Sequence, residues 1–230
     1  MTQTTRLQET GAAEAPALQR RGVLASAGTI LLGGIAAQAL PGAARAGTPP
    51  SLTRRAIFFD PGAPVLGNPK GTLPIAEFFD YRCPYCRGMH PMLQRLIAKN
   101  PDIRYVAKQW PIFGGPSVIA ARVALAANWQ GRFSAINDAL FKTHIVDEAS
   151  VMQAARQSGA DMARLAHDMK ARAKDLDATL AVADLQAHAL GLHGTPSFII
   201  GSYLVPGALS EKDLAAVVKD ARAKLARKPA

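Results

Sequence analysis

The chain has 230 residues, with 27 Lys and Arg against 17 Asp and Glu and therefore a formal charge of +10. Hydrophobic residues make up 49% and charged residues 19%, which suits one globular core and excludes a disordered or fibrous chain. The two cysteines exclude a small scaffold held by many disulfides, and no apolar run suggests several membrane spans.

The first 46 residues have the layout of an export signal. The paired Arg20 and Arg21 end a polar stretch, an apolar stretch diluted with Ala and Gly follows, and Ala44-Arg45-Ala46 offers small residues for cleavage. The arginine pair and the weakly hydrophobic stretch are more typical of a twin-arginine signal than of a general secretory one. An uncleaved anchor helix is the alternative. We expect export, with cleavage near Ala46.

The excess of basic residues does not predict a nucleic-acid partner. Such a site needs Lys and Arg clustered among aromatic side chains, whereas here the charges are scattered along helical patterns and aromatic residues make up 6%. A solvated basic surface that keeps the protein soluble explains the charge.

The predicted domain begins with strands around one helix. Pro and Gly mark its loops, and Pro74 lies near the start of a β-type run, where a strand tolerates proline best. In chain order the predictions are a tether over 47–55, an edge strand over 56–59, a loop over 60–71, a strand over 73–79, a helix over 89–99 and a strand over 103–108.

The second half is mainly helical. An Ala-rich block over about 117–190 has helical periodicity, broken near Gln130-Gly131 and Ser158-Gly159, which predicts three to five helices. Two short strands over 198–200 and 203–205 then predict a hairpin, and Ser210 caps a last helix that ends near residue 226.

This order of elements predicts an α/β fold. It is a thioredoxin-type fold with a helical insertion between its βαβ and ββα halves. We divide the chain into a signal over 1–46, a tether and edge strand over 47–66, and a domain over 67–230.

Both cysteines lie in Cys83-Pro84-Tyr85-Cys86, after a strand and at the start of a helix. There the first sulfur lies near free backbone N–H groups and the positive end of the helix dipole, which favour thiolate over thiol. Cys83 is therefore the predicted nucleophile, and its low pKa also makes it a good leaving group. Cys86, one helical turn later, is placed to resolve a mixed disulfide.

Two other uses of the cysteines stay open. A purely structural disulfide would close a loop of about four residues, which stabilises a fold little. A metal site needs ligands besides the two thiols, and His90 lies four residues after Cys86 on the same helical face. Because thiolates suit Cu(I), a periplasmic copper-binding or chaperone-like protein is the alternative to an enzyme.

Two stretches resemble the DsbA-like thiol:disulfide oxidoreductases of the bacterial periplasm. They are residues 78–91, around the cysteines, and residues 194–201, which begin with Gly194-Thr195-Pro196. The CPYC centre is similar to the branch that includes DsbG and the ScsC-like proteins. The resemblance implies a thioredoxin fold and a periplasmic enzyme without cofactor that exchanges disulfides with extended or unfolded polypeptides.

The resemblance also implies a membrane partner that resets the two cysteines. Only about ten residues separate the cleavage site from the first predicted strand, which leaves no room for the N-terminal dimerisation domain of the isomerases. We therefore expect a monomer and an oxidase-like direction of exchange, although the Pro84-Tyr85 dipeptide of the CPYC centre and Thr195 are similar to the isomerase and reductase branch.

Further site residues follow from the resemblance. Pro196 is expected to follow a cis bond opposite the cysteines, where the backbone of Thr195 would bind substrate main chain without sequence preference. Pro84 and Tyr85 are expected to contact substrate as well. His193, beside this loop, is a candidate for tuning the site.

Glu77 lies six residues before Cys83, at a position where the family commonly has a buried carboxylate beneath the resolving cysteine. There it would exchange a proton with Cys86, with its pKa raised by burial. A surface acid at a sheet edge is the alternative. Lys108 is a candidate partner of Glu77, and His90 is either a tuning residue or a packed structural one.

Overall fold

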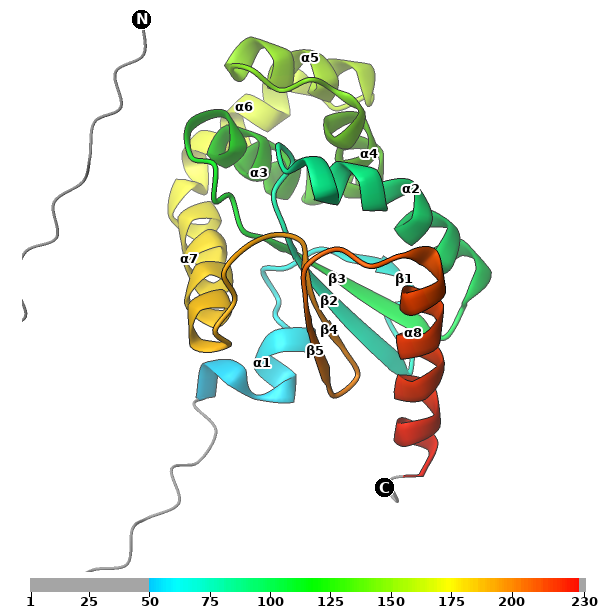
Figure 1. Ribbon diagram of the computed structural model, residues 1–230. Coiled ribbons are helices and arrows are strands. Elements are labelled where there is room, and N and C mark those ends of the chain that lie inside the picture. Colours follow the sequence, from blue (N-terminus) through cyan, green and yellow to red (C-terminus); the bar gives the residue numbers. More distant parts are fainter. Residues whose placement is uncertain (1–49, 228–230) are drawn as a thin grey trace, which may run out of the picture. The chain divides into compact units, whose positions relative to one another are not determined.

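A five-stranded sheet forms the centre of the computed structural model, which describes residues 50–227. The predicted export signal and its cleavage site lie outside the described residues. The strand order is β1-β3-β2-β4-β5 (Figure 1), and the only parallel pair within the described sheet is β2 with β3. The strands are β1 (Val65–Gly67), β2 (Leu73–Phe79), β3 (Ile103–Gln109), β4 (Ser197–Ile200) and β5 (Tyr203–Pro206).

Eight α-helices are described besides a short 3-10 turn at Pro50–Leu52, and five of them form the predicted helical block between β3 and β4. The predicted breaks at Gln130-Gly131 and Ser158-Gly159 lie between helices of this block. The helices are α1 (Arg54–Phe58), α2 (Pro84–Lys99), α3 (Gly115–Asn128), α4 (Phe133–Lys142), α5 (Glu148–Gln157), α6 (Met162–Ala171), α7 (Ala173–Ala189) and α8 (Glu211–Ala226).

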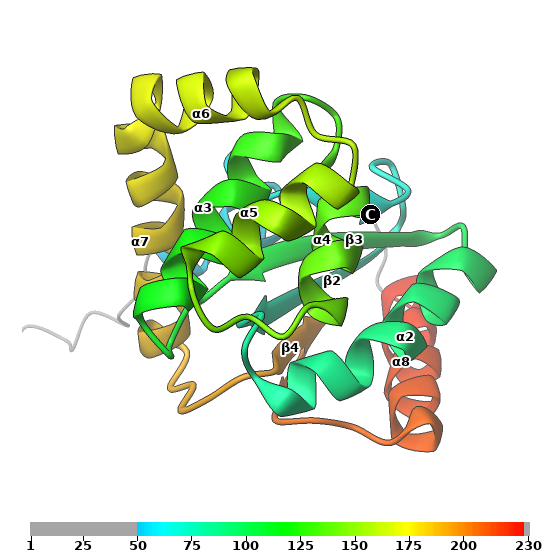
Figure 2. The same ribbon diagram turned by 90° about the horizontal axis from the view of Figure 1, so that it is seen from above.

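The central strand β2 is buried at every position and divides the interior into two packed layers. Because neighbouring strand residues point to opposite faces, Ile75, Glu77 and Phe79 share one face. That face packs against α2, α8 and the insertion, with α4 and α5 lying over the strands in Figure 2. The other face, with Phe78, packs against α1 and α7. The predicted fold class, a thioredoxin fold with a helical insertion, is confirmed.

The predicted edge strand over 56–59 was wrong. Residues 54–58 form α1, whose N-cap Thr53 accepts a hydrogen bond from the Ala56 amide at 3.2 Å. The side chains of Ile57 and Phe58 on this helix are buried against the sheet. An apolar run of four residues is too short for its periodicity to separate a strand from a helical turn. The edge strand next to β3 is β1 instead.

Candidate active site

Cys83 and Cys86 lie where the chain leaves β2 and enters α2. Cys83 is the N-cap residue, with extended backbone, and Pro84 opens the helix. Both thiols are free and both residues are buried, whereas Pro84 and Tyr85 between them are exposed. A molecule approaching this face meets Tyr85, which is 67% exposed.

Asp80 holds the turn between β2 and α2. Its carbonyl oxygen accepts a hydrogen bond from the Cys83 amide at 3.1 Å. Its carboxylate accepts from the Arg82 amide at 2.7 Å, the Phe113 amide at 3.0 Å and the Ser117 hydroxyl at 2.8 Å. These bonds fix the backbone on which Cys83 is carried.

The surroundings of Cys83 lower its pKa to about 5. The largest cause is the hydrogen bond from the Cys86 thiol, and the backbone N–H groups of Cys86 and Tyr85 add to it, while burial opposes it. These amides are the free donors expected at a helix start. Cys83 is therefore a thiolate at neutral pH in the dithiol form.

Cys86 is shifted in the opposite direction. Burial raises the pKa of the Cys86 thiol well above its usual range, and both its hydrogen bond to Cys83 and the charge of Glu77 add to the rise. One proton is thus retained on Cys86 while Cys83 is ionised. This asymmetry matches the division between an attacking and a resolving cysteine.

The loop before β4 brings Thr195 and Pro196 against the cysteines. The peptide bond between them is cis, which confirms that expectation. The Cys83 thiol, when protonated, donates to the Thr195 carbonyl oxygen at 3.1 Å. Pro196 is buried and Thr195 half-buried, while His193 is exposed in the same loop.

Glu77 is buried on β2 rather than exposed at a sheet edge, with 2% of its surface accessible. One carboxylate oxygen, Oε2, accepts a hydrogen bond from the Tyr105 hydroxyl on β3. The other, Oε1, is buried without a hydrogen-bond partner among the described residues. Burial raises the pKa of Glu77 to about 8, the Tyr105 bond opposes the rise, and the negative charge of Cys83 adds to it.

Lys108 is not the partner of Glu77, contrary to the suggestion from the sequence. In the parallel register Glu77 lies opposite Ala107 and Phe78 opposite Lys108, so Lys108 points to the other face of the sheet. There its Nζ forms an ion pair with Asp60 Oδ2 at 2.6 Å. Burial lowers the pKa of Lys108, and Asp60 opposes this shift.

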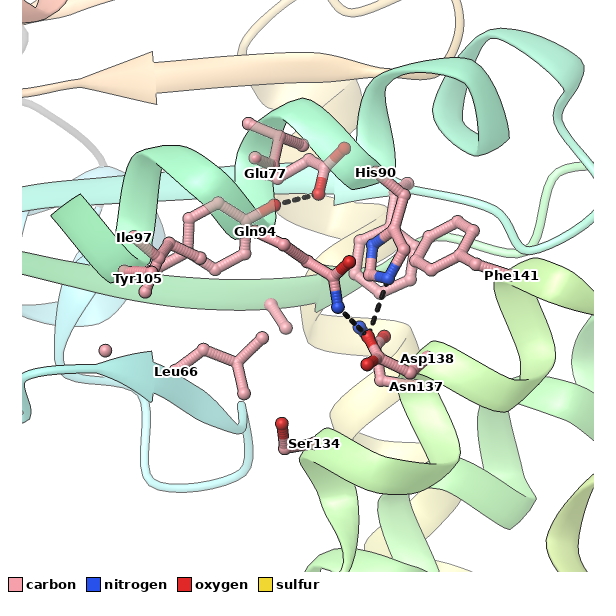
Figure 3. A pocket seen from close by; sticks show the side chains of 15 residues that line it. Leu66, Glu77, His90, Gln94, Ile97, Tyr105, Ser134, Asn137, Asp138 and Phe141 are labelled. Atoms are coloured by element: carbon pink, nitrogen blue, oxygen red, sulfur yellow. Dashed lines mark hydrogen bonds and ion pairs between the residues drawn. The ribbon is translucent and has the colours of Figure 1, made fainter. Parts of the chain in front are cut away.

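A cavity of about 210 Å³ adjoins Glu77 between the sheet, α2 and α4 (Figure 3). In its lining, His90 Nε2 lies 2.8 Å from Asp138 Oδ1, and the Gln94 amide donates to the same oxygen. The remaining lining is largely apolar and includes Leu66, Leu93, Ile97 and Phe141. The buried carboxyl group of Glu77 therefore borders a cavity whose lining is partly polar.

His90 makes the contacts of a packed residue. Its ring stacks on Phe141 with centroids 4.3 Å apart, and its Nε2 faces Asp138 rather than a sulfur. Burial lowers the pKa of His90, and Asp138 opposes the shift. Among residues 50–227, no three His, Cys, Asp or Glu side chains are grouped so as to hold a metal ion.

The sequence did not point to Tyr105 or Asp138. Tyr105 lies two residues before the partner of Glu77 in the β2–β3 register and on the same face. Its role would have been found had the strand register been known. Asp138 lies in the insertion, and no pattern in the sequence connects it with α2.

The comparisons with known proteins agree with this geometry. A family model described as thioredoxin matches residues 60–220. A thioredoxin-like oxidoreductase from Silicibacter pomeroyi is 42% identical, with a TM-score of 0.71, and the match covers 74% of this chain and 98% of that one. A periplasmic thioredoxin-like protein from Salmonella enterica serovar Typhimurium is 35% identical, with a TM-score of 0.66 and coverage of 74% and 95%. The thiol-disulfide exchange protein α-DsbA2 from Wolbachia pipientis is 25% identical, with a TM-score of 0.68 and coverage of 72% and 90%.

Curated relatives match over a smaller part of their length. The Na(+)/H(+) antiporter NhaA 3 of Salinispora tropica is 28% identical over 176 residues, which are 72% of this chain and 26% of that protein. The chain thus spans about a quarter of the length of the curated relatives it matches. None of the helices described between residues 50 and 227 is long and apolar enough to cross a membrane.

Proposed function

The chain belongs to the DsbA-like family of thiol:disulfide oxidoreductases with a thioredoxin fold, and from that premise we propose that it oxidises thiols of exported polypeptides through Cys83 and Cys86. The family membership establishes thiol:disulfide exchange. The direction, the substrates and the compartment are the proposal. The observation that carries the direction is the environment of Cys83.

The reaction begins with the Cys83–Cys86 disulfide. A substrate thiolate attacks Cys83, a bond forms between the two sulfurs, and Cys86 leaves as a thiolate that takes up a proton. A second substrate thiolate then attacks the substrate sulfur of this mixed disulfide and releases Cys83 as a thiolate. The substrate loses two electrons and gains a disulfide, and the two cysteines of the enzyme are reduced.

The low pKa of Cys83 favours this direction. A thiolate of low pKa is a good leaving group in the second step, and its stabilisation by the Cys86 thiol and helix amides stabilises the reduced enzyme relative to the disulfide. A dithiol that is stable when reduced is a strong oxidant, since the equilibrium favours electron transfer from the substrate to Cys83 and Cys86.

Glu77 supplies the proton for Cys86 in this scheme. With a pKa of about 8 its carboxyl group is largely protonated at neutral pH and has a proton to give to Cys86, whose thiol pKa is raised well above its usual range. Loss of a proton to the Cys86 thiolate leaves a buried carboxylate that the Tyr105 hydroxyl stabilises. The cavity beside Glu77 offers space for water to restore the proton.

The backbone at Thr195 is the proposed binding edge for substrate. Its carbonyl oxygen lies beside the Cys83 sulfur, so substrate main chain running along this loop passes the reacting atom. Main-chain hydrogen bonds give affinity that does not depend on side chains. Pro84 and Tyr85, exposed at the start of α2, are the other proposed contacts for substrate.

The proposed setting is the periplasm, with a membrane protein that reoxidises Cys83 and Cys86 and with the enzyme acting as a monomer. Support comes from the signal pattern in the sequence and from the periplasmic relative in Salmonella. The copper-binding alternative has less support, because His90, the third ligand it would use, places its Nε2 against Asp138.

Thiol trapping in intact cells tests the direction. A mass-tagging alkylator added after acid quenching counts the free thiols of the protein, with Cys83→Ser as the marker for one remaining thiol. We expect the pair to be mostly oxidised, and to become reduced when the membrane oxidant is removed. A mostly reduced pair in growing cells would instead identify an isomerase or a reductase.

A further inference from the structure

Cationic side chains line a second pocket directly beside the cysteine motif. It measures about 160 Å³ and is lined by Arg82, Arg87, His144, Ile145 and Val146. Arg82 precedes Cys83 and Arg87 follows Cys86, so both arginines flank the redox motif in the chain. No lining residue is acidic. We refer to these five residues as the arginine pocket.

Backbone carbonyl groups at the end of α4 hold the guanidinium group of Arg87 in place. Arg87 Nη1 donates to the carbonyl oxygens of Leu140 at 3.4 Å and Thr143 at 2.5 Å, which belong to the last turn and C-cap of α4. The other guanidinium, on exposed Arg82, makes one long bond of 3.5 Å to the Phe113 carbonyl. Both arginines therefore keep N–H donors free for a ligand.

Neither guanidinium has a carboxylate partner among residues 50–227, whereas the arginines at 95, 122 and 222 each form an ion pair. Two acids close to these residues in the chain are engaged elsewhere. Asp80 is buried and accepts three hydrogen bonds, and Asp147 caps α5 by accepting from the Ser150 amide at 2.8 Å. The positive charge of the pocket thus faces solvent without an internal counter-ion.

Exposed apolar side chains occur in the arginine pocket and in the stretches of chain next to its residues. Val146, 56% exposed, is part of its lining, and Tyr85, 67% exposed, lies between the cysteines. Phe113, 49% exposed, is bonded through its backbone to both Arg82 and Asp80. Aromatic and apolar side chains mixed with arginine are the composition of protein-binding surfaces, and acidic side chains are the matching partners of unpaired guanidinium groups.

We propose that the arginine pocket binds the carboxylate of an Asp or Glu that lies near the reacting cysteine of a polypeptide substrate. The proposal rests on the function proposed above and adds a side-chain preference to the backbone recognition at Thr195. The planar guanidinium forks of Arg82 and Arg87 fit a carboxylate in two-point hydrogen bonds. Because the pocket is open to solvent, the preference is modest and weakens with salt.

The test measures one exchange step with two matched peptides. In a Cys86→Ser background Cys83 carries 2-thiopyridine as a mixed disulfide. A peptide thiolate attacks the Cys83 sulfur, forms the Cys83–peptide disulfide and releases thiopyridine, which takes up a proton and is read by absorbance. The peptides contain one cysteine flanked on both sides by Asp or by Asn. Each rate is divided by the rate of the same peptide with neutral dithiodipyridine, which corrects for intrinsic thiol reactivity.

At low ionic strength we expect the corrected rate for the Asp peptide to exceed that for the Asn peptide by about two- to fivefold. The ratio falls toward one in high salt and in the Arg82→Gln/Arg87→Gln double variant. Arg227→Gln, the same substitution at the exposed C-cap of α8, keeps the full ratio. Arg82→Gln alone, which removes one long hydrogen bond, keeps the fold and lowers the ratio in part.

Equal rates for the two peptides, or a preference that survives in the double variant, would overturn the proposed carboxylate binding by the arginine pocket. Either result would leave the proposed oxidase function intact. The Asn peptide tests the proposed function separately from the arginine pocket. If its rate with the Cys83 mixed disulfide is no faster than with dithiodipyridine, the proposed function itself fails.

Discussion

The sulfur of Cys83 lies 3.1 Å from the carbonyl oxygen of Thr195, although 112 residues separate the two in the chain. The sheet creates this contact, because β2, which leads to Cys83, pairs with β4, which begins two residues after Thr195. The nucleophile and the proposed substrate-binding edge are therefore carried by neighbouring strands. The helical insertion connects the two halves without separating them.

The first prediction concerns the titration of Cys83. Since the hydrogen bond from Cys86 is the largest cause of its low pKa, Cys86→Ala should move the pKa of Cys83 upward from about 5. The amides at the start of α2 remain, so the pKa should stay below that of a free thiol. The rate of alkylation by iodoacetamide against pH gives the midpoint. Cys83→Ser, with no titration in this range, is the control, and an unchanged midpoint would contradict the assigned cause.

A second prediction links redox state to stability. The pKa of Cys83 is depressed in the folded dithiol form, so its stabilising effect is fully present above the unfolded value near 9 and is lost as pH falls through about 5. The reduced protein should therefore gain stability relative to the oxidised one as pH rises from 5 to 9. Thermal unfolding of both forms measures this difference. A difference between the two forms that does not change with pH would argue against thiolate stabilisation. The same holds if Cys83→Ser gains stability over the oxidised parent between pH 5 and 9 as the reduced parent does.

Most of the fold could be predicted because its long elements have clear periodicity. The strand over 73–79 was predicted with the bounds that β2 has, and Ser210 does cap α8 by accepting from the Asp213 amide at 3.1 Å. The segment over 56–59 failed because four apolar residues fit either a strand or a helical turn. Its state was decided by the Thr53 cap and by packing on the sheet.

The site was predictable where local sequence determines it and not where strand register does. The position of Cys83 at the start of α2 and the cis bond before Pro196 both follow from short motifs and their family resemblance. Whether Glu77 faces Tyr105 or Lys108 depends on the register of β2 and β3. A shift of the register by one residue would move all side chains of one strand to the opposite face of the sheet. A single sequence does not contain that information.

Replacement of Glu77 tests the proton transfer. Glu77→Gln keeps the shape but has no proton to give, so the step that releases Cys86 should slow by about a hundredfold at neutral pH. In the unmodified protein this step should slow as pH rises through about 8, where Glu77 loses its proton, and the variant should lack that inflection. Acid quenching of the mixed disulfide measures the step. Glu148→Gln on the exposed first turn of α5 should behave as the parent.

The same variant has a stability signature that separates a buried acid from a surface one. The folded pKa of Glu77 is raised, so its contribution is fully present below the unfolded value near 4.5 and is lost as pH rises through about 8. Glu77→Gln should therefore gain stability relative to the parent between these values, by a few kcal/mol at about 1.4 kcal/mol per pKa unit. Denaturant unfolding across pH measures the gain, and no gain would contradict burial of Glu77 as a neutral carboxyl group.

Tyr105→Phe should shift the pH profile of the step that releases Cys86 to higher pH rather than simply lower the activity. The Tyr105 hydroxyl stabilises the Glu77 carboxylate, so its removal should raise the pKa of Glu77 further, by about one to two units. The inflection of the Cys86 step then moves above 8 while the rate below it changes little. Tyr203→Phe on β5 is the matched control. An inflection that does not move would show that Tyr105 leaves Glu77 unaffected.

Lys108 offers a test of the corrected pairing. Lys108→Met leaves the Asp60 carboxylate without its ion-pair partner and should cost about 3–5 kcal/mol of stability, as loss of one partner from a buried ion pair does. Lys108→Met combined with Asp60→Asn removes both charges and should recover part of that cost, which a double-mutant cycle in denaturant unfolding measures. Because Lys108 lies on the opposite face of the sheet from Glu77, the inflection near pH 8 should stay in place in both variants. Additive costs together with a moved inflection would instead pair Lys108 with Glu77.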